Sequence, residues 1–358
     1  MTESGKFSLH EIGTQQISWQ SAIDQTLARQ SDLQQLLSRN AGNDLIFTGC
    51  GSTHYLAQFA APYFQAVTGR RCRAVPASEL LLQTDTVAIP GERPLIVALS
   101  RSGATSETIM AVEKMRARGS DALTISCYAD TPLATASSLT IGIPEGREES
   151  FAQTRSFAGM LISVQCLAAL VADDSLLLDE LRQLPSLGPD LIRRAQQVTQ
   201  PWATTDSYQR ITYLGSGPLY GLANEATVKM KEMALSLAEG YHFMEFRHGP
   251  MSLVDRDHLV VGLVSESTRA YELAVLQDLC ERHAQVLVIA NRDDLGNGDW
   301  DGAFFLNSPL SERANSVLYL PFVQYLACQR ACWRGLNPDR PRNVVMSIQL
   351  HGTDMVEG

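Results

Sequence analysis

The sequence predicts an α/β fold made of two tandem units, each a parallel sheet flanked by helices. Short apolar runs alternate with longer amphipathic stretches along most of the chain, which is typical of strands covered by helices on both faces. A strand-like run ends in a glycine turn at Gly49-Cys50-Gly51 and again at Gly215-Ser216-Gly217, 166 residues later. The chain has 358 residues, enough for two ordinary domains. Two similar units in tandem explain this length better than one large domain.

The first 38 residues are expected to form a helical arm, because apolar side chains recur at mostly helical spacing between residues 15 and 38. A first α/β domain is predicted over residues 39–184. Its expected strands are 44–48, 95–99, 122–127 and 139–143, and its expected helices include 55–67 and 105–118. The apolar stretch 159–172 is interrupted by Ser163 and Gln165 and is shorter than the ~20 residues that cross a membrane, so we expect a buried core helix there.

Prolines and polar residues interrupt the chain between the two predicted domains. Pro185, Pro189 and Pro201 indicate a linker over residues 185–205. The second domain is predicted over residues 206–335. Its expected strands are 211–214, 258–264, 285–290 and 303–306, and a helix is expected from about Pro218 to Glu239. Residues 336–358 are expected to form a C-terminal tail.

Composition limits the kinds of partner and the compartment. Twenty-nine Lys and Arg against 39 Asp and Glu give a formal net charge of -10, which disfavours nucleic acid and membrane surfaces and leaves any phosphate to a local site. The seven Cys are scattered, and the N-terminus has no basic region followed by an apolar run, so we expect a cytoplasmic protein with reduced thiols. His and Cys show no metal-ligand spacing, and we predict neither a metal nor another cofactor.

Each glycine turn alone is a weak indication of ligand binding. Such a turn lets backbone amides approach a phosphate, but it is equally consistent with a tight turn that binds nothing. A dinucleotide fingerprint needs a third small residue, and its place is taken by His54 in the first turn and by Tyr220 in the second. Nicotinamide binding is therefore disfavoured.

The strongest candidate for a phosphate site is the segment 98–108, where a predicted buried strand ends in a hydroxyl-rich turn that opens a helix. Ser100, Ser102 and Thr105, with the first amides of the helix, can surround a compact dianion without a lysine. The alternative is an ordinary serine cap and turn. We favour the phosphate site because open parallel sheets bind ligands at the C-terminal ends of their strands.

A second constellation lies on the helix predicted from Pro218. Glu225, Lys229 and Glu232 are spaced i, i+4 and i+7, so they share one face. They form either a solvated ion-pair ladder or a cluster in a cleft. The apolar neighbours Met230 and Met233 leave little room for an exposed polar face and favour a cleft in which Glu232 has a perturbed pKa.

His248 follows this helix in the run Glu245-Phe246-Arg247-His248-Gly249-Pro250. Gly249 allows an unusual backbone angle, and Pro250 suits the first position of a following helix. An imidazole on such a constrained loop can move protons at neutral pH, although a lone histidine can equally be structural.

Together these motifs resemble the sugar isomerase (SIS) domain family, with two flavodoxin-like domains of that family in tandem. Residues 100–105 are similar to the family's phosphosugar-binding SxSGxT motif. Residues 225–250 are similar to the isomerase domain of glutamine:fructose-6-phosphate amidotransferase. Residues 239–255, together with Glu11 and Trp19 near the start, are similar to the tagatose-6-phosphate ketose/aldose isomerase group.

The resemblance implies a role for each matching residue. Ser100, Arg101, Ser102 and Thr105 would bind the phosphate, with Thr53, Gln153 and Thr154 nearby. Glu232 would be the base that moves a proton between C1 and C2 of an open-chain 6-phosphosugar. His248, which in the family is often supplied by a neighbouring subunit, would assist ring opening, and Glu225 and Lys229 would frame that site.

The sequence departs from the amidotransferase at two places. The glutamine-hydrolysing domain with its N-terminal cysteine nucleophile is missing, so glutamine-dependent amination is not expected. The segment 339–347 is similar to the amidotransferase tail, but Met346 occupies the place of its ring-opening lysine. A Schiff base from this tail is excluded, which leaves ring opening to His248.

We therefore expect a phosphosugar isomerase that interconverts aldose and ketose 6-phosphates by enediol-type proton transfer. An isomerising amino-sugar-6-phosphate deaminase would use the same proton transfer, so it stays open as an alternative. A noncatalytic sugar-phosphate sensor is the alternative from another class, although the first 40 residues are too few for a DNA-binding helix pair and its linker. The expected ligand is a small sugar phosphate, and the leading amphipathic helix and the family's shared sites indicate a homodimer.

Overall fold

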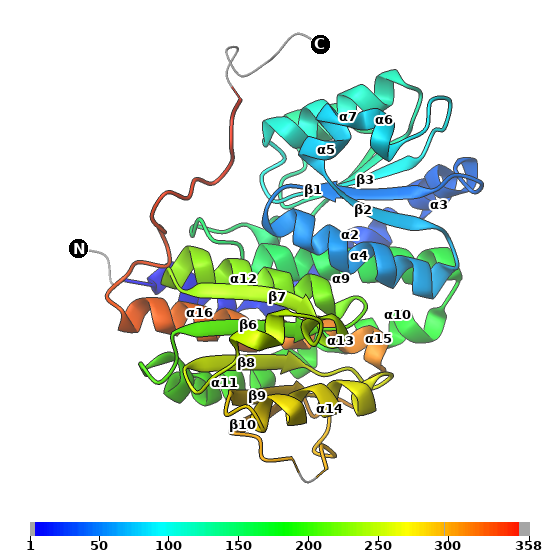
Figure 1. Ribbon diagram of the computed structural model, residues 1–358. Coiled ribbons are helices and arrows are strands. Elements are labelled where there is room, and N and C mark those ends of the chain that lie inside the picture. Colours follow the sequence, from blue (N-terminus) through cyan, green and yellow to red (C-terminus); the bar gives the residue numbers. More distant parts are fainter. Residues whose placement is uncertain (1–3, 297, 351–358) are drawn as a thin grey trace. The chain divides into compact units, whose positions relative to one another are not determined.

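Each half of the chain builds a parallel sheet of five strands, and the chain divides into two units around these sheets (Figure 1). The computed structural model describes residues 4–296 and 298–350. Within these residues, the unit that holds the first sheet comprises residues 17–148, 155–182 and 345–350. The unit that holds the second sheet comprises residues 4–16, 149–154 and 183–344. We call them the first-sheet unit and the second-sheet unit.

The first sheet has the strand order β2-β1-β3-β4-β5, and all neighbouring strands run parallel. Its strands are β1 (Leu45–Gly49), β2 (Cys72–Pro76), β3 (Leu95–Ser100), β4 (Ala122–Ser126) and β5 (Leu139–Gly142). This is the flavodoxin-like order, which confirms the predicted fold class. The edge strand β2 is only half-buried and has no apolar run, so its sequence gave no strand signal.

Helices cover both faces of the first sheet (Figure 1). They are α2 (Gln15–Ala28), α3 (Gln30–Arg39), α4 (Ser52–Thr68), α5 (Ala77–Leu82), α6 (Thr84–Val87), α7 (Ser106–Ala117), α8 (Pro132–Ala136), η1 (Pro144–Gly146), α9 (Arg155–Ala172) and α10 (Ser175–Leu181). On one face, α5, α7 and α8 contribute Leu80, Val112 and Leu133 to a shared apolar core. On the other face, α4 packs against α9.

Helix α9 is the buried core helix that the sequence predicts over residues 159–172. By length and composition alone it resembles a membrane span, but 78% of its residues 155–172 are buried inside the protein. No other helix in the described residues passes the same test. Its apolar residues are therefore accounted for by the core of its own unit.

The second sheet repeats the topology of the first. Its order is β10-β9-β8-β6-β7, again with parallel neighbours throughout. Its strands are β6 (Arg210–Gly215), β7 (Leu237–His242), β8 (His258–Leu263), β9 (Gln285–Ala290) and β10 (Gly302–Phe305). In both sheets the first strand of the unit lies between the second and the third, so the prediction of two similar units in tandem is confirmed.

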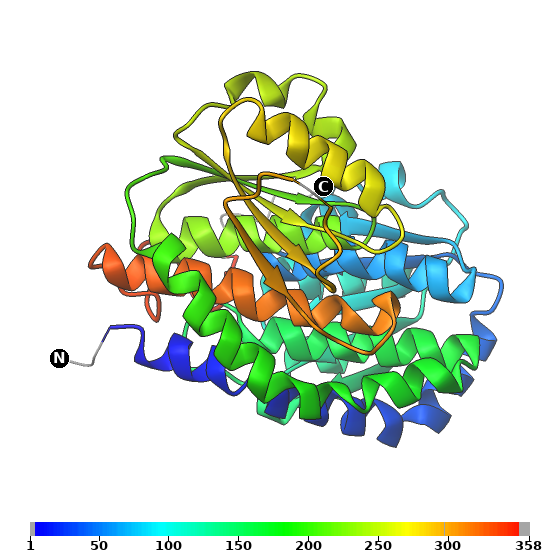
Figure 2. The same ribbon diagram turned by 90° about the horizontal axis from the view of Figure 1, so that it is seen from below.

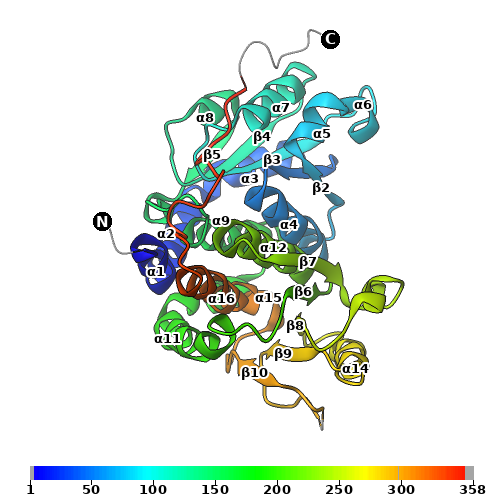
Figure 3. The ribbon, with the colours of Figure 1, turned by 60° about the vertical axis from the view of Figure 1, so that its left-hand side comes forward.

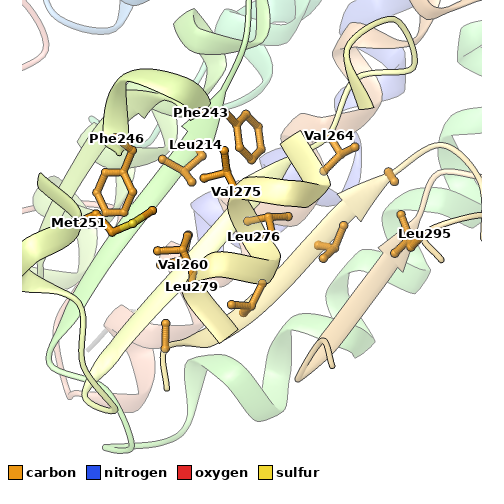
Figure 4. Close-up of a cluster of buried hydrophobic side chains, with 14 residues drawn as sticks. Leu214, Phe243, Phe246, Met251, Val260, Val264, Val275, Leu276, Leu279 and Leu295 are labelled. Carbon is orange, nitrogen blue, oxygen red and sulfur yellow. The ribbon is translucent and has the colours of Figure 1, made fainter. Parts of the chain in front are cut away.

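Helices also cover both faces of the second sheet. They are α1 (Lys6–Gly13), α11 (Leu184–Ala203), α12 (Leu219–Ala234), α13 (Phe243–Phe246), η2 (Pro250–Leu253), α14 (Arg269–Cys280), α15 (Glu312–Asn315), η3 (Ser316–Tyr319) and α16 (Leu320–Trp333). Helix α16 lies beside α11, as Figure 2 shows, and also packs on α12. On the opposite face, Val275, Leu276 and Leu279 of α14 point toward strand side chains such as Val260 (Figure 4).

Two expected helices differ from those in the structure. The helix expected to reach Glu239 ends at Ala234, because Leu235 takes a left-handed backbone with φ of 49° and the chain then enters β7. The helix expected over 15–38 is divided into α2 and α3, and α1 precedes them.

The stretch 185–205, predicted as a linker, is also helical, since α11 spans nearly all of it. Pro185 lies in the first turn of α11, where no backbone amide is required, and Leu191, Ile192 and Ala195 form a buried stripe along it. Its role in joining two domains stays a prediction.

Candidate active site

The first sheet reverses its strand order between β1 and β3, and open α/β sheets bind ligands at such a point. β1 and β3 pair from Leu45 opposite Leu95 to Thr48 opposite Ala98, so the segments that follow the two strands emerge next to each other. One segment is the glycine turn that opens α4. The other is the β3–α7 loop, residues 101–105.

Hydroxyl groups gather at the β3–α7 loop as the sequence predicts. Ser100 Oγ accepts a hydrogen bond from the backbone N of Gly103 at 3.1 Å, and Ser102 Oγ accepts one from the backbone N of Ala104 at 3.2 Å. Because both oxygens act as acceptors, their protons are left to donate to a ligand. Thr105 is the N-cap of α7, and its side chain makes no capping bond. Three hydroxyl donors thus lie at the positive end of a 12-residue helix.

Gly103 fixes the backbone of this loop. Its φ is 62°, a left-handed value that favours glycine, and an added Cβ would lie 2.7 Å from the Cβ of Thr131. We expect Gly103→Ala to lower the free energy of unfolding by about 2–5 kcal/mol, because the left-handed backbone costs an L-residue about 1–2 kcal/mol and overpacking adds about 1–3. Urea unfolding of the two proteins measures this difference.

Gly91→Ala is the matched control for that variant. Gly91 has φ of 94°, but nothing lies within 4 Å of an added Cβ. It therefore carries the backbone strain without the clash against Thr131. Equal losses in the two variants would contradict the idea that Thr131 confines the loop.

Thr53 lies in the glycine turn, and its hydroxyl is used locally. Thr53 Oγ1 donates to the carbonyl O of Cys50 at 2.9 Å and accepts from the backbone N of Cys50 at 3.0 Å. The Cys50 thiol is 3.5 Å from Thr108 Oγ1, and burial raises its pKa above the ordinary value. The thiol therefore stays protonated at neutral pH and is a poor nucleophile.

Arg101 is not a free cation at the loop. Its guanidinium is 4% exposed, and Nη1 lies 3.1 Å from Glu148 Oε2. Glu148 also accepts hydrogen bonds from the backbone N and the hydroxyl of Ser156 at the start of α9, at 3.0 and 2.6 Å. This buried ion pair joins the loop to α9. The positive potential at the loop therefore comes mainly from the amides of α7.

The C-terminal segment reaches the same loop within the first-sheet unit (Figure 3). The carbonyl O of Met346 accepts from Arg101 Nη2 at 3.3 Å, and that of Ile348 accepts from the backbone N of Ser106 at 3.2 Å. Gln349 Nε2 donates to the carbonyl O of Ala104 at 2.6 Å. The position where the sequence carries Met346 therefore lies close to the hydroxyl cluster.

In the second-sheet unit, Glu225, Lys229 and Glu232 share one face of α12 as predicted. Lys229 Nζ is 3.4 Å from Glu225 Oε1 and 2.7 Å from Glu232 Oε2. The side chains of Glu225 and Lys229 are 1% exposed and that of Glu232 is 27% exposed. The alternative of a solvated surface ladder is therefore wrong. Lys229 lies between the two carboxyl groups, and that of Glu232 is the one that reaches solvent.

His248 is exposed on the turn that joins α13 to η2. Gly249 next to it has φ of 122°, an angle that glycine readily adopts, and Pro250 opens η2, as the sequence predicts. Within the described residues the imidazole makes no hydrogen bond or ion pair. It is therefore available to a ligand or to another chain.

A comparison with protein-family models adds to this geometry. The model for the SIS domain matches residues 39–170 and 206–295, together more than half of the chain. The chain belongs to the SIS domain family. The resemblance carried by the SxSGxT-like loop and by residues 225–250 is thereby confirmed.

Curated relatives of this SIS protein include glutamine–fructose-6-phosphate aminotransferases (isomerizing). That of Pseudomonas putida is 27% identical over 370 residues, which cover 96% of this chain and 59% of the relative. That of Acidithiobacillus ferridurans is 28% identical over 363 residues, with the same coverage. The chain thus spans about three-fifths of the length of these relatives.

Solved structures of SIS relatives match nearly the whole chain. Tagatose-6-phosphate ketose/aldose isomerase from Escherichia coli superposes with a TM-score of 0.85 at 25% identity, covering 95% of this chain and 97% of that one. Glucosamine-6-phosphate deaminase from Thermotoga maritima superposes with a TM-score of 0.74 at 26% identity, covering 92% and 100%. Both neighbours and both curated relatives are enzymes by name.

Gln153 and Thr154 lie on a short segment of the second-sheet unit that the buried carboxylate of Glu11 and the backbone carbonyl of Asp339 hold in place. Glu11 accepts hydrogen bonds from the backbone N of Glu149 at 2.6 Å and of Ser150 at 3.2 Å. Asp339 accepts from the backbone N and the hydroxyl of Ser8, at 2.7 and 2.8 Å, and the backbone N of Phe151 donates to its carbonyl.

Sequence reasoning recognised Glu11 only through the family resemblance and missed Asp339. Their backbone partners lie more than 130 residues away along the chain, so no local pattern indicates them. The described residues contain no group of three or more His, Cys, Asp or Glu side chains that could hold a metal ion.

Proposed function

We propose that this protein is a phosphosugar isomerase that interconverts aldose and ketose 6-phosphates. The observation that carries the proposal is the pairing of Glu232 with Lys229, because a carboxylate held at 2.7 Å by a buried ammonium and still 27% exposed is both oriented and accessible. The similarity to an enzyme named tagatose-6-phosphate ketose/aldose isomerase, at 25% identity over most of both chains, supports this reaction class.

Glu232 is the proposed base. Its carboxylate removes the proton from C2 of an open-chain aldose 6-phosphate to form an enediolate. The protonated carboxyl group returns this proton to C1, and the hydroxyl proton on O2 moves to O1, which gives the ketose. The proton lies beside a carbonyl, so it becomes acidic only when the enediolate is stabilised. Lys229 and Glu225 are proposed to keep the reacting carboxylate in one position.

The β3–α7 loop is the proposed phosphate site, with Ser100, Ser102 and Thr105 as hydroxyl donors. Arg101 is proposed to hold the loop through Glu148. Thr53, whose hydroxyl is bonded to Cys50, is proposed to shape the neighbouring turn. Gln153 and Thr154 remain proposed contacts from the resemblance alone.

Removing two of the donors tests the phosphate site. We expect the double variant Ser102→Ala/Thr105→Val to bind inorganic phosphate and sugar phosphates at least about 100-fold more weakly, because a hydrogen bond to a charged group contributes about 1.5–3 kcal/mol. Calorimetric titration with inorganic phosphate measures this loss. Ser207→Ala is the control, since Ser207 is an exposed serine of the second-sheet unit. An unchanged affinity in the double variant would rule out this loop as the phosphate site.

We also propose that His248 assists ring opening and that the protein acts as a cytoplasmic homodimer. The imidazole of His248 is exposed, which supports a role for it in the active site of a second subunit. All seven cysteines are free, which suits a reducing compartment. Light scattering tests the dimer, and a fully active monomer would contradict it.

Deamination is the second candidate function, and the 26% identity to an enzyme named glucosamine-6-phosphate deaminase favours it. The two reactions share the proton transfer, since an enolamine replaces the enediol. Incubation with tagatose-, fructose-, glucosamine- and galactosamine-6-phosphate, followed by ketose and ammonia assays, decides between them. Failure to turn over any of the four, with no proton exchange at C1 or C2, would leave the sugar-phosphate sensor.

A further inference from the structure

The second sheet has its own point of strand reversal, between β6 and β8, and the loop there repeats the β3–α7 loop. The β8–α14 loop is residues 264–268, so both loops have five residues between strand and helix. Both also contain a serine and a threonine at the same two places, Ser102 and Thr105 in one and Ser265 and Thr268 in the other. By its length and by the places of its hydroxyls, the second loop is also a candidate place for an anion, although Glu266 takes the place of the left-handed Gly103.

The hydroxyl groups of the second loop are already used by a carboxylate. Glu272, 1% exposed, accepts from the backbone N of Ser265 at 2.7 Å, from its hydroxyl at 3.0 Å and from the hydroxyl of Thr268 at 2.7 Å. Glu272 is the fourth residue of α14, whereas the fourth residue of α7 is Ile109. The first loop therefore has no acid at the corresponding position.

A second carboxylate, from a different element, accepts hydrogen bonds from the Glu266 and Ser267 part of the same loop. Glu312 in α15 accepts from the backbone N of Glu266 at 3.0 Å and from the backbone N of Ser267 at 3.2 Å. The hydroxyl of Ser267 donates to it at 3.3 Å. Two consecutive amides and a hydroxyl around one anion are the contacts by which such loops bind phosphate. The side chain of Glu266 turns instead to Asn291 Nδ2, at 2.6 Å.

We infer that the second-sheet unit is closed to phosphate by the chain itself, with the carboxylate of Glu312 as the anion of the β8–α14 loop. The protein then has one phosphosugar site, at the β3–α7 loop, although a loop of the same length lies at the equivalent place in the second sheet. The assignment of a ligand to the first loop rests on the proposed function. The closure of the second loop does not.

A tethered carboxylate is a strong competitor for free phosphate. Glu312 belongs to the same folded unit as the loop, so its effective concentration there is on the order of millimolar or more, whatever the concentration of ligand in solution. Tyr319 adds to the order of the site, because its hydroxyl donates to the carbonyl O of Val264 at 2.7 Å. Free phosphate must displace Glu312 before it can reach the two amides.

Removing the tethered anion tests the inference. Thermal unfolding of Glu312→Ala is compared with that of the unmodified protein, in phosphate and in chloride of equal ionic strength. We expect phosphate to raise the unfolding temperature of Glu312→Ala more than that of the unmodified protein, because a second occupied site adds a second binding contribution. Adding Ser267→Ala to Glu312→Ala is expected to remove the excess. Glu281→Ala, which deletes an exposed glutamate, controls for the change in net charge.

Equal phosphate shifts in Glu312→Ala, in Glu281→Ala and in the unmodified protein would overturn the inference. Equilibrium dialysis with inorganic phosphate decides the matter even if Glu312→Ala does not fold. We expect one saturable site per chain in the unmodified protein and none in Ser102→Ala/Thr105→Val. Two saturable sites in the unmodified protein would overturn the closure. No site in the unmodified protein, with one gained in Glu312→Ala, would contradict the proposed function and support the closure.

Discussion

Replacing Glu232 with glutamine is expected to lower turnover by about 10²–10⁴-fold, the usual contribution of a general base. The amide keeps the shape of the side chain and its contact with Lys229 but cannot accept the proton from C2. We therefore expect the affinity for sugar phosphate to change little, since the proposed phosphate donors belong to the β3–α7 loop. Proton NMR in heavy water measures this proton transfer directly, as the exchange of hydrogen for deuterium at C1 and C2 of the sugar.

Two comparisons make this first result interpretable. Glu281→Gln changes the same charge at an exposed position and is expected to keep full activity. A sensor would show no exchange with the unmodified protein, so the assay separates the enzyme from the binding protein before any substitution is made. Wild-type exchange rates in Glu232→Gln would exclude Glu232 as the base.

Replacing Lys229 with methionine is expected to destabilise the protein by about 3–5 kcal/mol. The ammonium is 1% exposed and lies between two carboxylates, and removing one partner of a buried ion pair leaves charge without compensation. Methionine fills much the same volume, so the loss reports mainly on charge. The midpoint of urea unfolding measures it.

Lys231→Met is the natural control, because Lys231 is exposed two residues away on the same helix. Its effect is expected to stay within about 0.5 kcal/mol. The double variant Glu225→Gln/Lys229→Met is expected to recover part of the loss, since it removes the fully buried carboxylate as well. Equal losses in Lys229→Met and Lys231→Met would contradict a buried ionised cluster.

The central strands of both sheets were predictable because each is a nearly continuous apolar run, as expected for a strand buried on both faces. β3 and β8 are apolar along most of their length and are followed by a polar turn and a helix, which indicates a parallel strand covered on both faces. The edge strands β2 and β7 carry no such run, because β2 is only half-buried along its length and most of β7 is half-buried or exposed. The end of α12 depends on the backbone of Leu235, a residue type that normally continues a helix.

The candidate site was predictable where its geometry is local. The spacing of Glu225, Lys229 and Glu232 places them on one face of a helix whatever the fold, and the hydroxyl loop follows directly from its strand. Burial of Lys229 depends on the tertiary packing around α12, which no local pattern specifies. Contacts such as Arg101 with Glu148, or the β8–α14 loop with Glu312, join residues more than 40 positions apart and become visible only in three dimensions.

Burial of Lys229 also limits where acylating reagents can modify the folded protein. Of the chain's four lysines, Lys6, Lys114 and Lys231 are exposed and Lys229 is enclosed. A label on Lys229 therefore marks molecules in which α12 has opened. Lys231, two residues further along the helix, is exposed in every molecule, so its labelling shows how far the reagent has reacted. The ratio of labelling at Lys229 to labelling at Lys231 therefore measures local unfolding of the helix that holds the proposed base.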